Sequence, residues 1–174
     1  MAEEVRTEPD PQEMWRIIDE HGHRGNFPAE AFAQPMAEIV QKPWGFELIW
    51  AKTETYVGKA EHIKAGHRIS MQYHAPNGDS PAKAETMFLM SGEVTLWMGT
   101  SPDNLVPVKM ELGFGYYIPP FTLHRMEAHV DSVVIEAAQP ETGDTVRIHD
   151  DYARGTETVE MRSQPNRGWN PKIT

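Results

Sequence analysis

Residues 68–74 read Arg-Ile-Ser-Met-Gln-Tyr-His, an alternation of polar and apolar side chains that is typical of a β-strand. Alternate side chains of a strand lie on one face, so Gln72 and His74 are expected to point the same way, together with Arg68 and Ser70. An amide oxygen and an imidazole on one face are two potential metal ligands. The stretch therefore predicts a strand that contributes two ligands to a metal site.

Two further potential ligands lie later in the chain. Glu85 begins a second strand-like run and lies seven positions before Gly92, and His124 follows a turn that Pro119-Pro120 would hold rigid. If these side chains converge with the first pair, they offer two imidazoles, one carboxylate and one amide oxygen. Such a set leaves coordination positions open for water or a substrate.

We therefore expect one divalent metal ion, for which Zn²⁺, Mn²⁺, Fe²⁺ and Ni²⁺ are the candidates. The expected ligands are Gln72, His74, Glu85 and His124. The competing interpretation is that these are ordinary polar residues on half-exposed strands, and that Gln72 orients a metal-bound water.

Short strand-like runs recur from Trp44 onward without helical patterns between them, separated by turn residues such as Gly66, Gly92 and Gly113. Many short strands at regular spacing predict an all-β sandwich or small barrel rather than an α/β fold. Strands are expected at residues 46–50, 56–63, 68–74, 85–90, 93–98, 115–118, 133–138 and 146–148.

The ends of the chain have a different character. Residues 1–41 are expected to form an extension with one short helix, capped by Asp10 and carrying an apolar stripe. The stripe consists of Met14, Trp15, Ile17 and Ile18. Residues 42–154 are expected to form the β domain, and residues 155–174 a polar tail.

Composition and charge exclude several classes of partner and of site. The 174 residues carry a net charge of −10 with no long basic run, which argues against nucleic-acid and membrane partners. No cysteine is present, so disulfides are excluded and any metal must be held by nitrogen or oxygen. Residues 1–5 lack the apolar run of a secretion signal, and no segment approaches membrane length. We expect a cytoplasmic protein that acts on a small molecule.

The two ligand-bearing segments resemble the paired motifs of the cupins. In the first segment, Gly66 precedes the ligand strand. The positions that match in the second segment are Gly113, Pro119 and His124. Phe121 stands where a glycine is usual. The resemblance implies a single jelly-roll cupin domain that holds a metal, and cupins often pair into homodimers.

Within the cupins, the chain is most similar to the mannose-6-phosphate isomerase group and related small sugar-isomerase-like proteins. The similar stretches are residues 42–45, 69–74, 117–120 with 124–125, and 146–154. In the last of them, Ala153 stands where the bacterial group usually has glycine.

Two departures from the usual cupin pattern bear on the site. Pro76 replaces a second histidine, which leaves Gln72 as the fourth ligand, and a Gln-x-His pair is what the zinc-dependent phosphomannose isomerases use. Residues 75–82 lengthen the hairpin before Glu85 at the expected barrel mouth, where they would reshape substrate access.

This resemblance implies an aldose–ketose isomerase that acts on a sugar or sugar phosphate through an enediol. The metal would polarise the carbonyl, and Lys83 or Glu136 would move the proton alpha to it. Lys83 should share the face of Glu85, although a solvated loop lysine is the alternative. Glu136 faces inward if Val133 and Ile135 face outward, where it would act as a base or as a partner of a ligand histidine.

Two other functions fit the same ligands. Two histidines and a carboxylate also suit an Fe²⁺ oxygenase or a lyase acting on a small organic acid. A non-enzymatic sugar-binding cupin is a third reading, because one fold supports many activities.

Several other charged residues have two interpretations. Lys59 and His62, on a strand beside the ligand strand, are expected to be exposed rather than catalytic. Arg147 and Arg154 are expected either to clamp an anionic substrate or to form structural salt bridges with Asp150 or Asp151.

Overall fold

The computed structural model describes residues 38–76, 78, 81–140 and 145–170. The helix expected near residues 10–21 lies outside this part of the chain. Within it, the structure consists of two antiparallel β-sheets with short helical segments, one between β6 and β7 and two after β11. No helix in these ranges is long and apolar enough to cross a bilayer.

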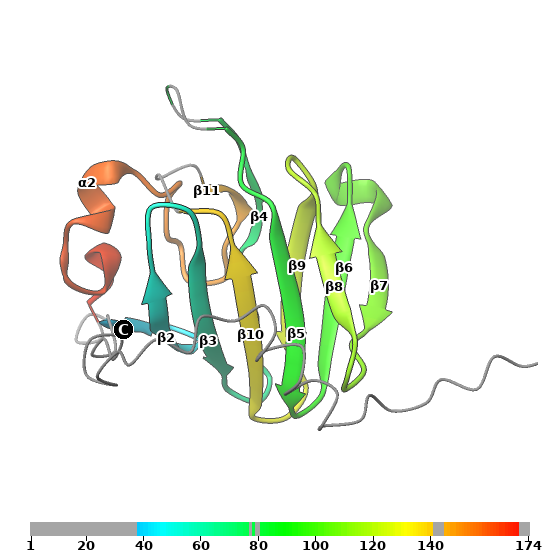
Figure 1. Cartoon of the computed structure of the whole chain (residues 1–174). Coiled ribbons are helices and arrows are strands. Elements are labelled where there is room, and N and C mark those ends of the chain that lie inside the picture. The colour runs from blue at the N-terminus through cyan, green and yellow to red at the C-terminus, as the bar shows by residue number, and fades with distance from the viewer. Residues whose placement is uncertain (1–37, 77, 79–80, 141–144, 171–174) are drawn as a thin grey trace, which may run out of the picture. The chain divides into compact units, whose positions relative to one another are not determined.

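The larger sheet has six strands in the order β1-β2-β3-β10-β5-β8, and Figure 1 shows β2, β3, β10 and β5 side by side. Its strands are β1 (Glu38–Lys42), β2 (Gly45–Lys52), β3 (Val57–Ile63), β10 (Ser132–Ala138), β5 (Glu85–Ser91) and β8 (Gly115–Ile118). The smaller sheet has five strands in the order β11-β4-β9-β6-β7. They are β11 (Thr145–His149), β4 (Met71–His74), β9 (Leu123–Ala128), β6 (Val94–Gly99) and β7 (Val106–Lys109). The all-β sandwich predicted from the sequence is confirmed.

Short helical segments complete the described chain. They are η2 (Pro102–Asn104), α2 (Val159–Arg162) and η3 (Pro165–Gly168). Helix α2 begins at Thr158, whose side chain accepts a hydrogen bond from the backbone N–H of Met161 and so satisfies one of the donors at the helix start. Segment η3 is tied to β1, because Asn166 Oδ1 accepts from the backbone N–H of Gln41. Segment η3 is therefore held against the edge strand of the larger sheet.

Strand boundaries agree with the expected runs at most positions. The ligand strand is shorter than expected, because β4 begins at Met71 and Arg68 forms only an isolated bridge with Glu127. Three strands were not expected from the sequence: β1, β7 and β9. Strand β9 matters for function because it carries His124 within a paired strand rather than in a loop.

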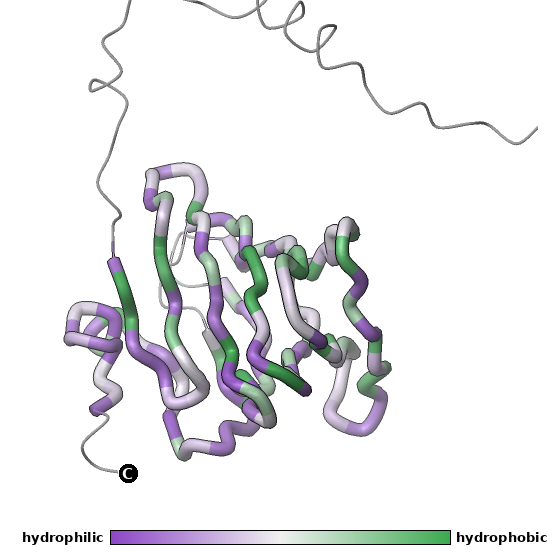
Figure 2. Tube along the Cα trace, turned by 90° about the horizontal axis from the view of Figure 1, so that it is seen from below, coloured by the Kyte–Doolittle hydropathy of each residue, from purple (hydrophilic) through white to green (hydrophobic). Residues whose placement is uncertain are grey.

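The inner faces of the sheets divide into an apolar end and a polar end. Figure 2 shows hydrophobic and hydrophilic residues following one another along the strands. The apolar end contains Ile63, Leu89, Val94, Leu96, Met126 and Val134, all of them buried. Burying each such side chain contributes about 1.5–3 kcal/mol. The polar end contains Glu47, Lys59, Glu61, Lys83, Glu85 and Glu136, which are equally buried.

Three predicted turn glycines adopt the backbone conformation that favours glycine. Gly66, Gly92 and Gly113 have φ values of 72°, 98° and 87°. At Gly92 a Cβ atom would also lie 2.2 Å from the hydroxyl of Ser132, so no larger residue fits without movement.

Two non-glycine residues adopt the same conformation. Phe121 has φ of 64° and Ala153 has φ of 56°. These are the two positions at which the cupin and isomerase motifs usually have glycine. A left-handed conformation costs an L-residue roughly 1–2 kcal/mol, so both turns are strained at these residues.

Candidate metal centre

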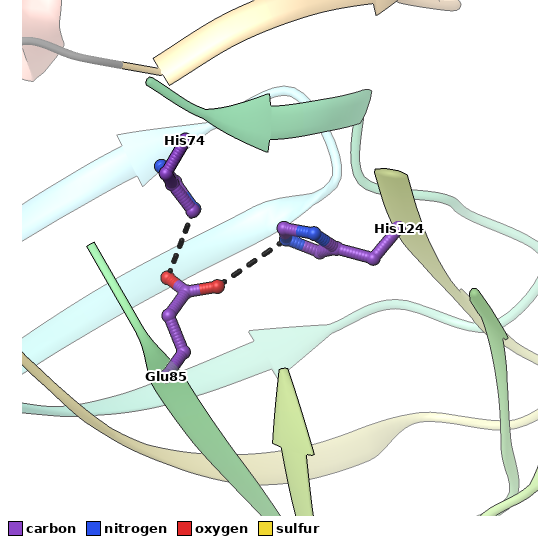
Figure 3. A group of neighbouring side chains, drawn as sticks. All are labelled: His74, Glu85 and His124. Atoms are coloured by element: carbon purple, nitrogen blue, oxygen red, sulfur yellow. Dashed lines mark ion pairs between the residues drawn. The ribbon is translucent and has the colours of Figure 1, made fainter. Parts of the chain in front are cut away.

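His74, Glu85 and His124 converge at the polar end. One potential ligand atom from each lies within 4.8 Å of the others, and all three residues are buried. His74 ends β4, Glu85 begins β5 and His124 lies near the start of β9. Figure 3 shows both imidazole rings directed at the carboxylate of Glu85. Because β5 belongs to the larger sheet and the other two strands to the smaller sheet, the group bridges the sandwich.

The carboxylate of Glu85 lies between the two rings. Its Oε1 atom is 3.1 Å from His74 Nε2, and its Oε2 atom is 3.3 Å from His124 Nε2. The ring centroids are 5.4 Å apart, with a tilt of 39° between the planes. Two nitrogens and a carboxylate at this spacing form a donor set for a divalent transition metal.

The hydrogen bond of His124 determines which of its nitrogens carries the proton. Nδ1 lies 2.9 Å from the carbonyl oxygen of Thr122, and a carbonyl oxygen only accepts, so Nδ1 is the donor. In the neutral ring Nε2 is then unprotonated, and its lone pair faces Glu85 Oε2. Neither of these atoms has a hydrogen-bond partner among the described residues. Two buried acceptors that face each other need a cation or a proton between them, so the residues fit a metal ion.

The protonation states of His74 and Glu85 also suit metal binding. Burial and the ammonium group of Lys83 lower the pKa of His74, and together they outweigh the opposite effect of Glu85. Burial alone would raise the pKa of Glu85, but Lys83 and His74 hold it well below its usual range. A neutral imidazole and an ionised carboxylate are the forms that bind metals.

Gln72 lies beside this group. It is opposite His124 in the pairing of β4 with β9, and it lines the same cavity as His74 and Glu85. Its Oε1 atom accepts a hydrogen bond of 2.6 Å from Ser70 Oγ, and an amide oxygen has a second lone pair to offer. Its role as a fourth ligand stays a prediction.

Lys83 and Glu136 are both buried next to Glu85, as strand alternation predicted. Lys83 contacts Glu85 directly, and its Nζ atom is 3.2 Å from Glu136 Oε1. The other oxygen of Glu136 is 3.2 Å from Lys59 Nζ. A hydrogen-bonded lysine–glutamate pair therefore adjoins the candidate ligands and could transfer protons. The catalytic roles of Lys83 and Glu136 stay predictions.

The expectation that Lys59 is exposed was wrong. Its exposed fraction is 3%, and it contacts Glu136 across the pairing of β3 with β10. His62 is half-buried and stacks on Phe46, with 4.9 Å between ring centroids. Strand β3 also lies in the larger sheet rather than beside β4.

Glu61 and its neighbour Glu47 were not identified from the sequence, although a signal was present. The run at residues 57–63 begins with Val57 and ends with Ile63, so two-residue periodicity places Lys59 and Glu61 on the same inner face as those apolar residues. A charged residue on the buried face of a strand is uncommon, so this periodicity is a signal for buried, paired charges.

The polar end surrounds a small cavity of about 40 Å³, enough for about three water molecules. Its lining includes His74 and Glu85, and also Glu61 and Ser70. Glu157 and Arg167 line it as well, so the segment after β11 forms part of the wall.

The arginines near the C-terminus form salt bridges. Arg154 Nη2 is 2.6 Å from Asp150 Oδ1, which is the structural alternative expected from the sequence. Arg147 instead contacts Glu157, with 3.5 Å between Nη2 and Oε2. Burial lowers the pKa of Arg147, and Glu157 acts in the opposite direction.

No protein-family model and no curated protein sequence matches the chain. Solved structures match its fold. The capsular polysaccharide assembling protein CapF from Staphylococcus aureus is 18% identical with a TM-score of 0.56, over 71% of this chain and 37% of CapF. An RmlC-like cupin from Shewanella frigidimarina is 13% identical with a TM-score of 0.52, over 64% of this chain and 96% of that protein. Streptomyces PAC13, solved with uridine, is 12% identical with a TM-score of 0.51, over 67% of this chain and 91% of PAC13.

At these identities the likeness concerns the fold alone. The chain has the fold of the RmlC-like cupins, which confirms the expectation from the sequence. It spans 37% of the length of CapF.

Proposed function

We propose that this chain, which has the cupin fold, is a metal-dependent aldose–ketose isomerase of the mannose-6-phosphate isomerase type, acting on a sugar or sugar phosphate. The observation that carries the proposal is the buried group of His74, Glu85 and His124 beside the Lys83–Glu136 pair. Gln72 is proposed as the fourth ligand, and Zn²⁺ as the favoured ion. The protein is proposed to be cytoplasmic.

The residues present can support both halves of this reaction. A divalent cation held by the ligands would supply a Lewis acid that polarises the substrate carbonyl. Lys83 and Glu136 supply a route for the proton alpha to that carbonyl, because Nζ and Oε1 are within hydrogen-bond distance of each other. One of them takes the proton, the C–H electron pair forms the double bond of the enediol, and the proton returns to the neighbouring carbon. Burial of all these groups limits access of bulk water.

The test compares metal content and turnover in one pair of variants. His74→Ala should lose both bound metal, measured by elemental analysis, and isomerisation of every aldose or aldose phosphate in a panel. His129→Ala is the matched control, because His129 is an exposed histidine near the end of β9, outside the candidate site. Full activity of His74→Ala after chelation would overturn the proposal.

Two outcomes would favour the other functions. Oxygen consumption by the iron-loaded protein, without isomerisation, would indicate an oxygenase. Tight binding of a sugar with no product by NMR after long incubation would indicate a binding protein.

We also propose a homodimer formed through the larger sheet. Its outer face carries a continuous apolar row across five strands, in which residues pair with their neighbours from strand to strand. The row consists of Ile39, Leu48, Ala60, Ile135 and Phe88. An apolar sheet face of this kind suits an isologous dimer. Ile135→Glu should yield a monomer by analytical ultracentrifugation, and a wild-type protein that sediments as a monomer would refute the dimer.

A further inference from the structure

One buried carboxyl group in the cavity has no role in the function proposed above. Glu61 lies on the inner face of β3, is 5% exposed and lines the same cavity as His74 and Glu85. Its Oε2 atom has no hydrogen-bond partner among the described residues. A buried carboxyl oxygen without a partner is costly if it is ionised, and it is available to a ligand that enters the cavity.

The surroundings of Glu61 disfavour its negative charge. Glu47 lies directly opposite it in the pairing of β2 with β3, and like charges at directly opposed positions repel. Glu136 is a diagonal neighbour on β10, because it pairs with Lys59, two residues from Glu61 on the same face.

The nearby lysines contact the other two carboxylates. Lys42 is 3.1 Å from Glu47, while Lys59 and Lys83 are each 3.2 Å from Glu136. Burial raises the pKa of Glu61 well above its ordinary value of 4.5, and Glu136 and Glu47 raise it further against the effect of Lys59. The surroundings of Glu61 therefore favour its protonated, neutral form.

We propose that Glu61 carries a proton between the two oxygen atoms of the substrate during isomerisation. This inference rests on the proposed function and assigns a step that Lys83 and Glu136 leave open. Those residues handle the proton on carbon, but an aldose and its ketose also differ in which oxygen bears hydrogen. A neutral acid with an unpartnered oxygen can both donate and accept a proton, which this exchange requires.

The step balances without any further reactant. As the base removes the proton from C2, the C–H electron pair forms the C1–C2 double bond, and O1 takes the proton of Glu61. The Glu61 carboxylate then takes the hydroxyl proton from O2, whose electron pair forms the new carbonyl at C2. The electrons of the C1–C2 double bond then form a new C–H bond at C1 with the proton held by the base. Both protein groups end in their starting states, and nothing is oxidised or reduced overall.

The test uses the full-length, metal-loaded protein and Glu61→Gln. Glutamine keeps the shape and can donate a hydrogen bond, but it cannot give up a proton at neutral pH. With the aldose that the wild type converts, in deuterated water, two rates are followed by NMR: exchange of the C2 hydrogen and formation of ketose. We expect exchange to persist within about tenfold of wild type, while kcat for ketose formation falls by about 10²-fold or more with little change in KM.

A second measurement needs no turnover. The infrared spectrum of the wild type near neutral pH should contain the carbonyl stretch of a protonated carboxyl group, and Glu61→Gln should lack it. Glu93→Gln is the control for both measurements, because Glu93 is exposed on the turn before β6. Metal content and circular dichroism of Glu61→Gln should match the wild type.

The outcomes separate the two proposals. If the wild type neither exchanges nor isomerises any sugar, the proposed function fails and the role of Glu61 fails with it. If the wild type is active, the role of Glu61 alone is refuted by full isomerisation in Glu61→Gln, by equal loss of exchange and isomerisation, or by an infrared band that persists in the variant.

Discussion

Replacing Glu136 by glutamine tests whether the ion pairs of the polar end hold the sandwich together. Glu136 is 2% exposed, and its two oxygens are each 3.2 Å from a lysine ammonium group, on Lys59 and on Lys83. Glu136→Gln keeps the shape but removes the negative charge between two buried positive charges. Lys83 keeps its contact with Glu85, so part of the compensation survives.

The size of the effect follows from that geometry. Breaking a buried ion pair by removing one partner costs about 3–5 kcal/mol, because the remaining charge loses part of its compensation. Since Lys83 retains a carboxylate, we expect the lower limit, about 3 kcal/mol. For a protein of this length each kcal/mol lowers Tm by roughly 2–4 °C, so the expected decrease is about 6–12 °C.

Urea titration and calorimetry of metal-free protein near pH 7 measure this difference. Glu93→Gln is the matched control, since an exposed substitution should change the free energy of unfolding by no more than about 0.5 kcal/mol. A Tm for Glu136→Gln within 2 °C or so of wild type would refute the reasoning, because the lysines would then be compensated by other groups.

Three further predictions concern other parts of the structure. The pKa of Glu61 is raised in the folded state, so the folded protein binds its proton more tightly than the unfolded chain does. The resulting stabilisation is complete below pH 4.5. As the pH rises from there toward the folded pKa, the free energy of unfolding falls by about 1.4 kcal/mol per pH unit. The stability of Glu61→Gln relative to wild type should therefore increase in urea titrations as the pH rises above 4.5, and a constant difference would contradict the raised pKa of Glu61. Ala153→Gly should raise the free energy of unfolding by about 0.5–1 kcal/mol, because relief of the left-handed strain exceeds the added chain entropy; a less stable variant would show that the turn is not strained. Zn²⁺ at about 100 times its Kd should stabilise the wild type by about 2.7 kcal/mol in a thermal-shift assay, and an equal shift in His124→Ala would place the ion elsewhere.

Two-residue periodicity was sufficient to predict most strands, whereas the convergence of three side chains was predicted from another signal. His74, Glu85 and His124 are separated by up to 50 positions, and the signal for their convergence was the pattern of ligand types with glycine and proline turns between them. Strand β9 was missed because the turn prolines drew attention to a loop, whereas residues 123–128 form six paired positions.

Long-range charge pairing could not be predicted from local patterns. Lys59 was expected to be exposed because an isolated lysine usually is, and its partner Glu136 lies 77 positions away. Glu61 was missed for the same reason, since its environment depends on Glu47 and Glu136 from two other strands. Backbone strain could not be predicted from the sequence either. Phe121 and Ala153 stand where the motifs usually have glycine, but only the structure shows that both residues adopt the left-handed conformation.

The separation of the interior into an apolar end and a polar end has a consequence for the order of folding. Collapse is driven by dehydration of hydrocarbon, and the larger of the two buried apolar clusters lies in the half around Leu89, Leu96 and Met126. We expect that half to be formed in the transition state, while the glutamates and lysines of the other half lose their water afterwards. Substitutions such as Leu96→Ala should then slow refolding, whereas Glu136→Gln should mainly accelerate unfolding.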